Sequence, residues 1–269
     1  MKSLNGKELA EYIQERQAGN VRNLRQSHKI IPKLAIIRTN PNPVVDSYMR
    51  IKQSYGTEIL VEVEVHTIDQ KDAIKTIQLL NEDDSVHGII VQIPLPDPTN
   101  TTEILDSVIA SKDVDGLGTN SKFDPPTPLA ITWLLAGYNI DLNGRHIVIV
   151  GNGRLVGKPL AKMWQGTDLD VTVIDKQSKD MVEQIKAADI LISATGVPSL
   201  IKADMVLPKA VIIDAGVATD SNGLVGDVAA DVRQLPDIAI TPEKGGVGPL
   251  TVTALFENVI TAAKATITV

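Results

Sequence analysis

The sequence predicts an α/β protein of two α/β domains, the second a Rossmann-like doubly wound parallel sheet, with a cleft between the domains. Short apolar runs rich in β-branched residues alternate with amphipathic stretches along nearly the whole chain, and this alternation favours parallel sheets covered by helices. A glycine-rich turn follows one of these apolar runs. The length of 269 residues suits two domains of modest size.

The first half of the chain contains three expected strands and four expected helices. Apolar or alternating runs indicate strands at residues 34–40, 58–67 and 88–94, and helical periodicity indicates helices at residues 7–17, 44–55, 71–81 and 101–110. Gly, Pro, Asp and Asn are frequent between residues 111 and 128, a composition typical of a junction between domains. We therefore expect a first domain over residues 1–118.

The second half opens with a helix expected at residues 128–138, followed by a strand, a glycine turn and a helix in HIVIVGNGRLVGKPLAKMW. Further β-branched runs predict buried strands at residues 171–175, 190–196, 211–216 and 238–242. These elements define a second domain over residues 119–248. A last helix within residues 249–269 is expected to pack back on the first domain.

The composition argues against several classes of protein. Cysteine is absent, which excludes disulfides and thiolate metal sites, and the four histidines are scattered, so no metal is expected. The net charge of −7 and the 3% aromatic content disfavour nucleic-acid binding, which needs clustered positive charge and stacking platforms. No apolar run is long enough to span a membrane, and the N-terminus lacks the apolar core of a signal peptide. A cytoplasmic location is the default expectation.

The glycine loop between residues 151 and 157 predicts a dinucleotide site. Its third glycine stands one place later than in the usual G-x-G-x-x-G spacing, but the roles of a tight turn, a close backbone approach and an anion-binding helix N-terminus are preserved. A plain turn also explains a glycine trio, whereas the strand before it and the helix after it favour the dinucleotide. The residues expected to bind the cofactor are Gly151, Asn152, Gly153, Arg154, Val156, Gly157, Asp175, Lys176, Thr195 and Gly196.

Asp175 bears on the choice of cofactor. It ends the next expected strand, near the roughly 20-residue distance at which an acid usually bonds the ribose of NAD. Its charge would repel the 2′-phosphate of NADP, but Lys176, Arg154 and Lys158 offer cations for that phosphate. A solvated strand end explains Asp175 equally, so the residues leave NAD and NADP open.

Several polar or glycine-rich positions are candidates for substrate binding. Tyr48 and Lys52 lie one turn apart on an expected helix, although a solvated pair is the simpler interpretation of that spacing alone. Gln92 lies in an apolar strand, where a buried amide needs partners; an edge position explains it as well. KDVDG (112–116) places two carboxylates at the junction, and GGVGPLT (245–251) suggests backbone close to a ligand. A simple turn and a tight connecting loop are the alternatives.

Together, six segments of the chain resemble the bifunctional methylenetetrahydrofolate dehydrogenase/cyclohydrolase family. They are SYMRIK (47–52), GIIVQIPLP (88–96), KDVDG (112–116), GNGRLVGKP (151–159), VGDV (225–228) and TPEKGGVGPLT (241–251). Their order and spacing cover nearly the whole chain. The combination of GGVGP with VQIPLP and KDVDG is highly specific.

The resemblance implies a folate cleft and two successive reactions, NADP-linked oxidation of 5,10-methylene- to 5,10-methenyl-tetrahydrofolate and hydrolysis to 10-formyl-tetrahydrofolate. It implies that Lys52 is the essential acid/base residue, that Gln92 holds and tunes it, and that Asp115 binds the pterin. Tyr48 is expected to stack on the aminobenzoyl ring. Burial and the substrate cation are expected to lower the pKa of Lys52, which would suit proton transfer near neutrality.

The resemblance also adds Gly245, Gly248 and Pro249 to the substrate-binding residues and implies a homodimer with NADP as its cofactor. Some features depart from the family. The segment after Gly116 is shorter than usual, Pro126 and Leu129 replace a common cysteine and glycine, and Asp175-Lys176 replaces the commoner His-Arg or His-Ser. These departures concern cofactor preference, and Asp175 keeps NAD as an option.

Two other functions stay open from the sequence. A monofunctional NAD-dependent methylenetetrahydrofolate dehydrogenase would agree with Asp175, although the intact set of Tyr48, Lys52, Gln92 and Asp115 argues for hydrolysis as well. A catalytically silent dinucleotide-binding protein would agree with the shortened segment. A shikimate-dehydrogenase-like enzyme shares the two-domain plan but does not explain GGVGP or VQIPLP.

Overall fold

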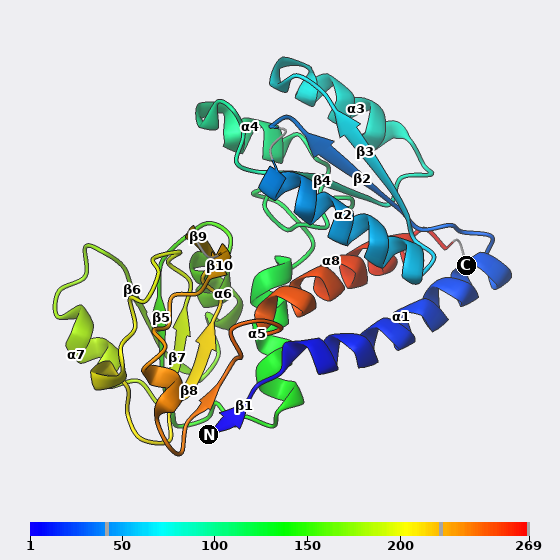
Figure 1. Cartoon of the computed structure of the whole chain (residues 1–269). Coiled ribbons are helices and arrows are strands. Elements are labelled where there is room, and N and C mark those ends of the chain that lie inside the picture. The colour runs from blue at the N-terminus through cyan, green and yellow to red at the C-terminus, as the bar shows by residue number, and fades with distance from the viewer. Residues whose placement is uncertain (41–42, 221–222, 268–269) are drawn as a thin grey trace. The chain divides into compact units, whose positions relative to one another are not determined.

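The computed structural model describes residues 1–40, 43–220 and 223–267, which form two compact units (Figure 1). Unit 1 comprises residues 1–10 and 127–251, and unit 2 comprises residues 11–126 and 252–269. The composition predicts that the first domain ends at residue 118, whereas the first segment of unit 2 extends to residue 126. The first ten residues of the chain belong to unit 1. The last two residues of the expected C-terminal segment lie outside the described residues.

Unit 2 is built on a three-stranded parallel sheet in the order β3-β2-β4. In register, Ile36 of the central strand pairs with Val65 on one side and Ile90 on the other. The elements are β2 (Lys33–Arg38), β3 (Glu62–Thr67), β4 (Gly88–Val91), α1 (Gly6–Ser27), α2 (Pro43–Glu58), α3 (Ala73–Glu82), α4 (Thr101–Asp106) and α8 (Val247–Lys264), with the 3-10 turns η1 (Gln70–Asp72) and η2 (Pro98–Asn100).

The central strand β2 is buried on both faces, and its side chains alternate between two cores. Leu34 and Ile36 belong to a core that also contains buried residues of α1, α2 and α8. Ala35 and Ile37 belong to a second core with α3 and α4, and Figure 1 shows helices on both sides of this sheet. A strand between two cores needs a continuous apolar run rather than an alternating one, which explains the run LAII.

Unit 1 contains a six-stranded parallel sheet in the order β1-β11-β8-β7-β5-β6. The strands are β1 (Lys2–Ser3), β5 (His146–Val150), β6 (Asp170–Ile174), β7 (Ile190–Ser193), β8 (Val211–Asp214) and β11 (Ala239–Ile240). The chain passes from β5 to β6 at one edge and then continues on the other side of β5 through β7 and β8. This reversal places the topological switch point at β5, and the predicted doubly wound class is confirmed.

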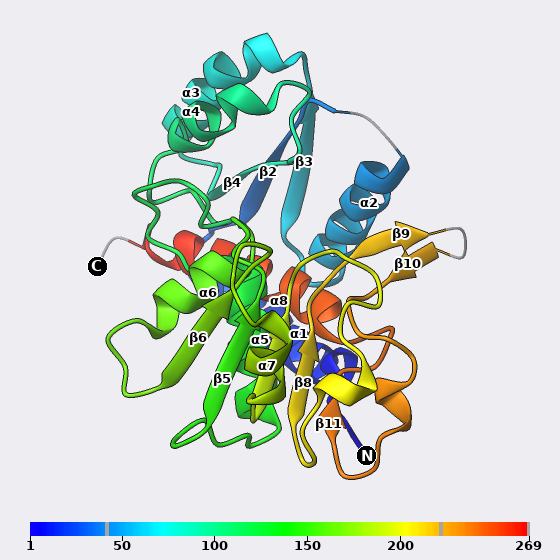
Figure 2. The ribbon, with the colours of Figure 1, turned by 90° about the vertical axis from the view of Figure 1, so that its left-hand side faces the viewer.

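Unit 1 contains the helices α5 (Pro126–Gly137), α6 (Gly157–Trp164) and α7 (Met181–Lys186), and the 3-10 turns η3 (Ala203–Met205) and η4 (Val232–Gln234) follow later in the chain. An antiparallel pair, β9 (Ala218–Asp220) and β10 (Gly223–Val225), follows β8. Figure 2 shows β6 and β5 side by side and the β9–β10 pair as a separate ribbon. The core of this sheet lies around Val148, Leu191 and Ile212.

The sequence does not predict β1, α7 or the β9–β10 pair. Strand β1 has two residues, both exposed, so it carries no hydrophobic periodicity. It exists because the backbone N–H groups of Lys2 and Leu4 donate to the carbonyl oxygens of Ile238 and Ile240, at 2.7 and 2.9 Å. These long-range bonds draw the start of the chain into the sheet of unit 1.

Within the described part of the chain, no helix combines the length and apolar character that a membrane crossing needs. The same residues contain no cluster of three or more His, Asp or Glu side chains placed to hold a metal ion.

Candidate active site

Helix α2 presents Tyr48 and Lys52 from unit 2. Val45 and Met49 are buried in the core on its inner side. Tyr48 and Lys52 lie one turn apart on another face of the helix, which leaves them for ligand contacts. Tyr48 is 37% exposed, and Lys52 is half-buried. An ion pair between Arg38 and Asp46 joins the end of β2 to the start of this helix.

Gln92 directly follows β4 and holds Lys52. The Nζ atom of Lys52 donates to Oε1 of Gln92 at 3.0 Å, and Nε2 of Gln92 donates to the carbonyl oxygen of Ile93 at 3.0 Å. The backbone N–H of Gln92 extends the sheet ladder to Ile37 at 2.9 Å. The amide is therefore oriented by the end of the strand, with its oxygen toward the amine.

The first three residues of KDVDG are structural. Nζ of Lys112 donates to the carbonyl oxygens of Leu80, Asn81 and Asp83 at 3.1, 2.9 and 2.7 Å, a cation at the C-terminal end of α3. Asp113 is 4% exposed and accepts from the N–H of Gly118 at 2.9 Å. Val114 is fully buried.

The last two residues of KDVDG bring Asp115 to the lysine. An isolated parallel bridge between Ile89 and Asp113 aligns this segment with β4, whose end carries Gln92. Gly116 has φ +67°, and an added Cβ would lie 2.7 Å from the carbonyl oxygen of Phe123, so a glycine is required for the turn. Of the two carboxylates in the motif, only Asp115 is left for a ligand.

The charges of Lys52 and Asp115 perturb each other in a desolvated setting. Burial lowers the pKa of Lys52, and the charge of Asp115 opposes that change. Burial raises the pKa of Asp115 to about 6, with Lys52 opposing the shift and Asp113 adding to it. The pKa values of the amine and the carboxyl group thus approach each other, which is the condition for proton exchange near neutral pH.

The glycine loop of unit 1 forms a cradle that larger residues would fill. Gly151 has φ +105°, and an added Cβ would lie 2.6 Å from the carbonyl oxygen of Ala194. A Cβ on Gly157 would overlap the carbonyl oxygen of Gly151, whereas one on Gly153 would meet no atom within 4 Å. Gly151 and Gly157 therefore shape the turn. Gly153 leaves open space beside the N-terminus of α6, where a pyrophosphate fits.

The other expected cofactor residues lie in the loops that follow the parallel strands of unit 1. Asn152 and Arg154 are exposed, and Val156 is the N-cap residue of α6. Asp175 follows β6, and its Oδ1 accepts from the N–H of Gln177 at 2.9 Å, while Lys176 is exposed.

Thr195 and Gly196 follow β7 in the same unit, and Gly196 has φ +69°. Three large apolar side chains in the loops after β5, β7 and β8 are exposed, namely Leu155 at 47%, Val197 at 50% and Val217 at 58%. An apolar lining at the carboxyl ends of the strands is what a nicotinamide or adenine ring requires.

The remaining expected residues, Gly245, Gly248 and Pro249, all lie in unit 1. Gly245 is in the loop before α8, and Gly248 and Pro249 are in the first turn of that helix. Gly245 has φ +83°, and its carbonyl oxygen accepts from the N–H of Lys7 at 2.9 Å. Gly248 is exposed, and an added Cβ there would meet no atom within 4 Å. Thus the structure brings Lys52, Gln92 and Asp115 together in unit 2 and the glycine-rich segments together with the parallel sheet of unit 1.

Sequence reasoning misses two kinds of supporting residue. Asn258 of α8 is 6% exposed and donates to the carbonyl oxygens of Val114 and Asp124 at 2.8 and 2.9 Å, so it ties the KDVDG segment to the helix. An amide on the apolar face of the last helix is the signal that could have revealed it. Asp214 and Asp227 of unit 1, discussed below, form a buried network at the end of the sheet.

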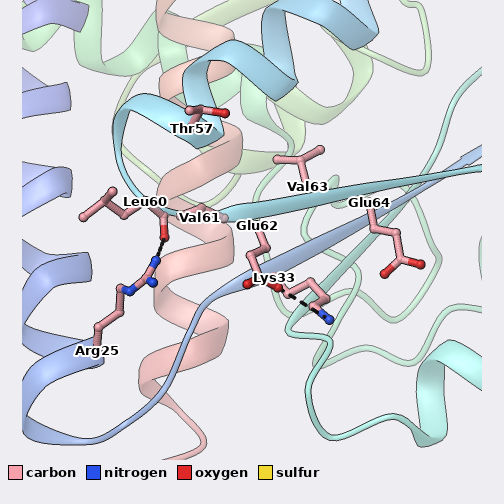
Figure 3. A pocket seen from close by; sticks show the side chains of 8 residues that line it. All are labelled: Arg25, Lys33, Thr57, Leu60, Val61, Glu62, Val63 and Glu64. Carbon is pink, nitrogen blue, oxygen red and sulfur yellow. Dashed lines mark hydrogen bonds and ion pairs between the residues drawn. The ribbon is translucent and has the colours of Figure 1, made fainter.

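A surface depression of about 460 Å³ on unit 2 contains none of the predicted residues (Figure 3). It is lined by Arg25, Lys33, Thr57, Leu60, Val61, Glu62, Val63 and Glu64. Three of its four charged side chains have partners in the lining, because Arg25 donates to the carbonyl oxygen of Leu60 at 3.0 Å and Lys33 pairs with Glu62 at 3.6 Å. Charges along the edge strand β3 oppose pairing with another strand, so we assign this depression no ligand.

A doubly wound parallel sheet with a glycine cradle at its switch point, in a chain whose other unit holds a desolvated lysine, defines a dinucleotide-binding α/β enzyme. Comparison with known proteins identifies the family. The model of the tetrahydrofolate dehydrogenase/cyclohydrolase catalytic domain matches residues 4–115, and that of the NAD(P)-binding domain matches residues 125–267. The chain belongs to this family, and the expectation from the six motifs is confirmed.

Individual relatives match over the whole chain. The bifunctional protein FolD of Nitratiruptor sp. is 36% identical over an alignment of 277 positions, which covers 98% of each protein. The crystal structure of the bifunctional FolD dehydrogenase/cyclohydrolase from Campylobacter jejuni has a TM-score of 0.94 at 36% identity and covers 99% of this chain and 100% of that one. The Trypanosoma brucei dehydrogenase-cyclohydrolase, solved with NADP and an inhibitor, has a TM-score of 0.92 at 28% identity and covers 99% and 98%.

Proposed function

We propose that this chain oxidises 5,10-methylenetetrahydrofolate to 5,10-methenyltetrahydrofolate with NADP and then hydrolyses the product to 10-formyltetrahydrofolate. The observation that carries the proposal is the desolvated amine of Lys52, held by Gln92 at 3.0 Å and electrostatically coupled to Asp115. Family membership and full-length similarity to bifunctional FolD enzymes support both activities.

The oxidation requires positioning rather than a protein nucleophile. A bound nicotinamide supplies the hydride acceptor, and the enzyme must hold it at near-attack distance from the one-carbon unit of the folate. In this proposal Asp115 accepts hydrogen bonds from the N–H groups of the pterin, and Tyr48, 37% exposed, stacks on the aminobenzoyl ring. Gly245, Gly248 and Pro249 complete the substrate contacts.

The hydrolysis requires a base and then an acid at one place. Water attacks the methenyl carbon, and the amine of Lys52 takes a proton from the attacking water. The protonated lysine then returns its proton to N5 as the bond between N5 and that carbon breaks, and the hydroxyl of the adduct loses its own proton to solvent and becomes the formyl carbonyl. The formyl group stays on N10, so the net products are 10-formyltetrahydrofolate and one proton. An amine of ordinary pKa is almost fully protonated at neutral pH, whereas the burial that lowers the pKa of Lys52 makes the free base available.

The cofactor cradle is proposed to consist of the loop from Gly151 to Gly157 and the loops after β6 and β7. It fits a dinucleotide because Gly153 leaves open space beside the start of α6. Exposed Arg154 and Lys176 favour a 2′-phosphate, and the similarity to an enzyme solved with NADP supports the same choice. Asp175 favours NAD, so an NAD-dependent dehydrogenase is the second candidate.

A side-by-side assay tests the proposal. The purified protein is mixed with methylenetetrahydrofolate and either NADP or NAD, and reduced cofactor is followed by absorbance, while a parallel cuvette follows the loss of methenyltetrahydrofolate. We expect reduced cofactor with a preference for NADP, and methenyl hydrolysis above the uncatalysed rate without any cofactor. Reduction only with NAD and no hydrolysis would support the second candidate, and neither activity would support a silent dinucleotide-binding protein.

Two expectations from the sequence stay predictions. The resemblance implies a homodimer, which size-exclusion chromatography with light scattering would detect. The cytoplasmic location, expected by default, would be checked by fractionating the source cells.

A further inference from the structure

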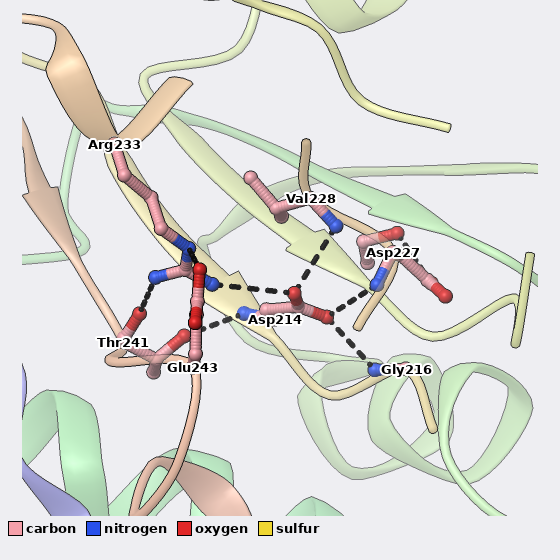
Figure 4. Close-up of polar contacts among 8 residues, drawn as sticks. Asp214, Gly216, Asp227, Val228, Arg233, Thr241 and Glu243 are labelled. Carbon is pink, nitrogen blue, oxygen red and sulfur yellow. Dashed lines mark hydrogen bonds and ion pairs between the residues drawn. The ribbon is translucent and has the colours of Figure 1, made fainter. Parts of the chain in front are cut away.

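Two aspartates of unit 1 form a buried network at the carboxyl ends of β7 and β8 (Figure 4). Asp227 is 0% exposed, and the side chain of Asp214 is 5% exposed. Neither carboxylate belongs to the glycine cradle or to the Lys52 site. Both nevertheless touch segments that carry expected cofactor residues, so their contacts indicate a role at the cofactor site.

Asp227 holds the loop that follows β7. Its Oδ2 accepts hydrogen bonds from Oγ of Ser193 at 2.7 Å, from the N–H of Thr195 at 2.7 Å and from Oγ1 of Thr195 at 2.9 Å. Oγ1 of Thr195 in turn accepts from the N–H of Val197 at 3.1 Å. One carboxylate oxygen therefore sets the backbone path of residues 193–197.

Asp214 holds the segment that carries Asp227. Its two oxygens accept from the N–H groups of Gly216, Asp227 and Val228 at 3.2, 3.0 and 3.1 Å. Nη2 of Arg233 lies 3.7 Å from Oδ2 of Asp214 and offsets part of its charge. Asp214 thus fixes the segment that carries Asp227, and Asp227 fixes the loop after β7.

Two glycines make room for this arrangement. A Cβ on Gly216 would overlap the carboxylate of Asp227, and a Cβ on Gly226 would overlap that of Asp214. Each aspartate therefore occupies the space beside a glycine of the other segment. The motifs VIIDAG and VGDV interlock through these pairs, which accounts for a motif to which sequence reasoning assigned no role.

Folding stability alone does not explain this network of buried carboxylates. Oδ1 of Asp227 has no hydrogen-bond partner among the described residues, and burial, together with the charge of Asp227, raises the pKa of Asp214. A buried ion pair can often be replaced by apolar side chains without loss of stability, so burying a charge is weak evidence for a stabilising role. Asp227 accepts three hydrogen bonds from residues 193 and 195. We therefore explain its burial by the need to hold that loop in one conformation.

We propose that Asp227 is a positioning residue for the nicotinamide half of the cofactor, acting through Thr195 and Gly196. In a doubly wound sheet the dinucleotide crosses the switch point, here β5, with its pyrophosphate at the glycine loop. The acid after β6, Asp175, marks the adenosine side, so the nicotinamide side lies over β7 and β8. The loops after those two strands are the ones that Asp227 and Asp214 hold. This inference rests on the proposed function of the chain.

The test compares NADP binding with methenyl hydrolysis, because the hydrolysis needs no cofactor and its proposed catalytic groups lie in unit 2. In Asp227→Ala we expect the Kd for NADP, measured by fluorescence titration, to rise about tenfold or more, as for loss of hydrogen bonds to a charged group. The kcat for methenyltetrahydrofolate should stay within about twofold of the parent, because Asp227 and Lys52 share no described hydrogen-bond partner. Asp227→Asn keeps an acceptor oxygen of the same shape, so it should restore most of the affinity.

Two further variants keep the test decisive if Asp227→Ala does not fold. Thr195→Val keeps the shape of the side chain but removes its hydroxyl, and with it the hydrogen bonds to the Asp227 carboxylate and from the N–H of Val197. We expect the Kd for NADP to rise about fivefold or more. Asp204→Asn alters an exposed carboxylate of the same unit and should leave the Kd unchanged. A lower melting temperature with an unchanged Kd in the Asp227 and Thr195 variants would overturn the inference. A parent protein that neither binds NADP nor hydrolyses methenyltetrahydrofolate would instead refute the proposed function.

Discussion

The Lys52 site of unit 2 and the aspartate network of unit 1 bury charge in opposite ways. In unit 2 the amine of Lys52 has one described hydrogen-bond partner, Gln92, and burial lowers its pKa. In unit 1 the carboxylates of Asp214 and Asp227 accept six hydrogen bonds from backbone and hydroxyl groups.

The difference separates two uses of a buried charge. A group with few partners exchanges a proton at little cost in structure, because few hydrogen bonds depend on its charge state. A group that accepts many bonds keeps its place and orients the donors around it. We therefore assign chemistry to the cluster in unit 2 and positioning to the cluster in unit 1, and the predictions below test that division.

The largest expected effect comes from Lys52→Met. Removing the proposed base should lower the rate of methenyl hydrolysis by about 10²–10⁴-fold, the usual range for a general acid/base, while folate binding measured by equilibrium dialysis stays near that of the parent. Lys71→Met is the matched control, because Lys71 is a lysine of the same unit with 77% of its side chain exposed. Hydrolysis at the parent rate in Lys52→Met would refute the assignment.

A pair of glycine variants separates shape from ligand contact in the cradle of unit 1. In Gly157→Ala the new Cβ would overlap the carbonyl oxygen of Gly151, so we expect the free energy of unfolding to fall by about 1–3 kcal/mol, as in overpacked sites. In Gly153→Ala the Cβ meets no atom within 4 Å, so chemical denaturation should show no loss. Its NADP affinity should still fall, because the added methyl group enters the open space. Unchanged NADP affinity in Gly153→Ala would argue against a pyrophosphate at that place.

Asp175→Ser tests the cofactor preference. The serine hydroxyl can still accept from the N–H of Gln177, now held by Asp175 at 2.9 Å, but it carries no charge to repel a 2′-phosphate. We expect the Kd for NADP to fall about fivefold, equivalent to about 1 kcal/mol for an exposed charge pair, and the Kd for NAD to rise. Isothermal titration with both cofactors measures the change. Equal affinities before and after the substitution would show that Asp175 does not discriminate.

The smallest expected effect is a pH dependence of stability. Between its lowered pKa and its usual value of 10.5, Lys52 is protonated in the unfolded chain but not in the folded one. The unfolded state then binds more protons, so the stability of the parent should rise with pH through this window. Lys52→Met lacks this contribution, and the difference in unfolding free energy between the two proteins should change with pH in urea titrations. Parallel curves would mean that the lysine is not desolvated.

Much of the fold follows from local patterns in the sequence. The runs LAII and HIVIV predict strands of a parallel sheet, because such strands are buried on both faces, and the structure has β2 and β5 there. Strand β1 is not predictable in this way. Its two exposed residues carry no pattern, and it depends on backbone bonds to Ile238 and Ile240, which are far away in the sequence.

The same distinction applies to the sites. Motifs identify Lys52, Gln92 and Asp115 as candidates, but a motif does not show that the Lys52 amine bonds the Gln92 amide at 3.0 Å. It also does not show that Lys112 and Asp113 serve the backbone of their own segment rather than a ligand.

By itself, the sequence determined the family and the doubly wound class and named the candidate residues for the chemistry, because these depend on periodicity, glycine placement and short motifs that are local along the chain. Only the tertiary structure decided that Asp227 braces the loop at Thr195, and that the first ten residues join unit 1. Those features depend on hydrogen bonds and burial between segments distant in sequence. The energy of such contacts depends on which groups lie close together in the folded protein, and a local sequence pattern does not contain that information.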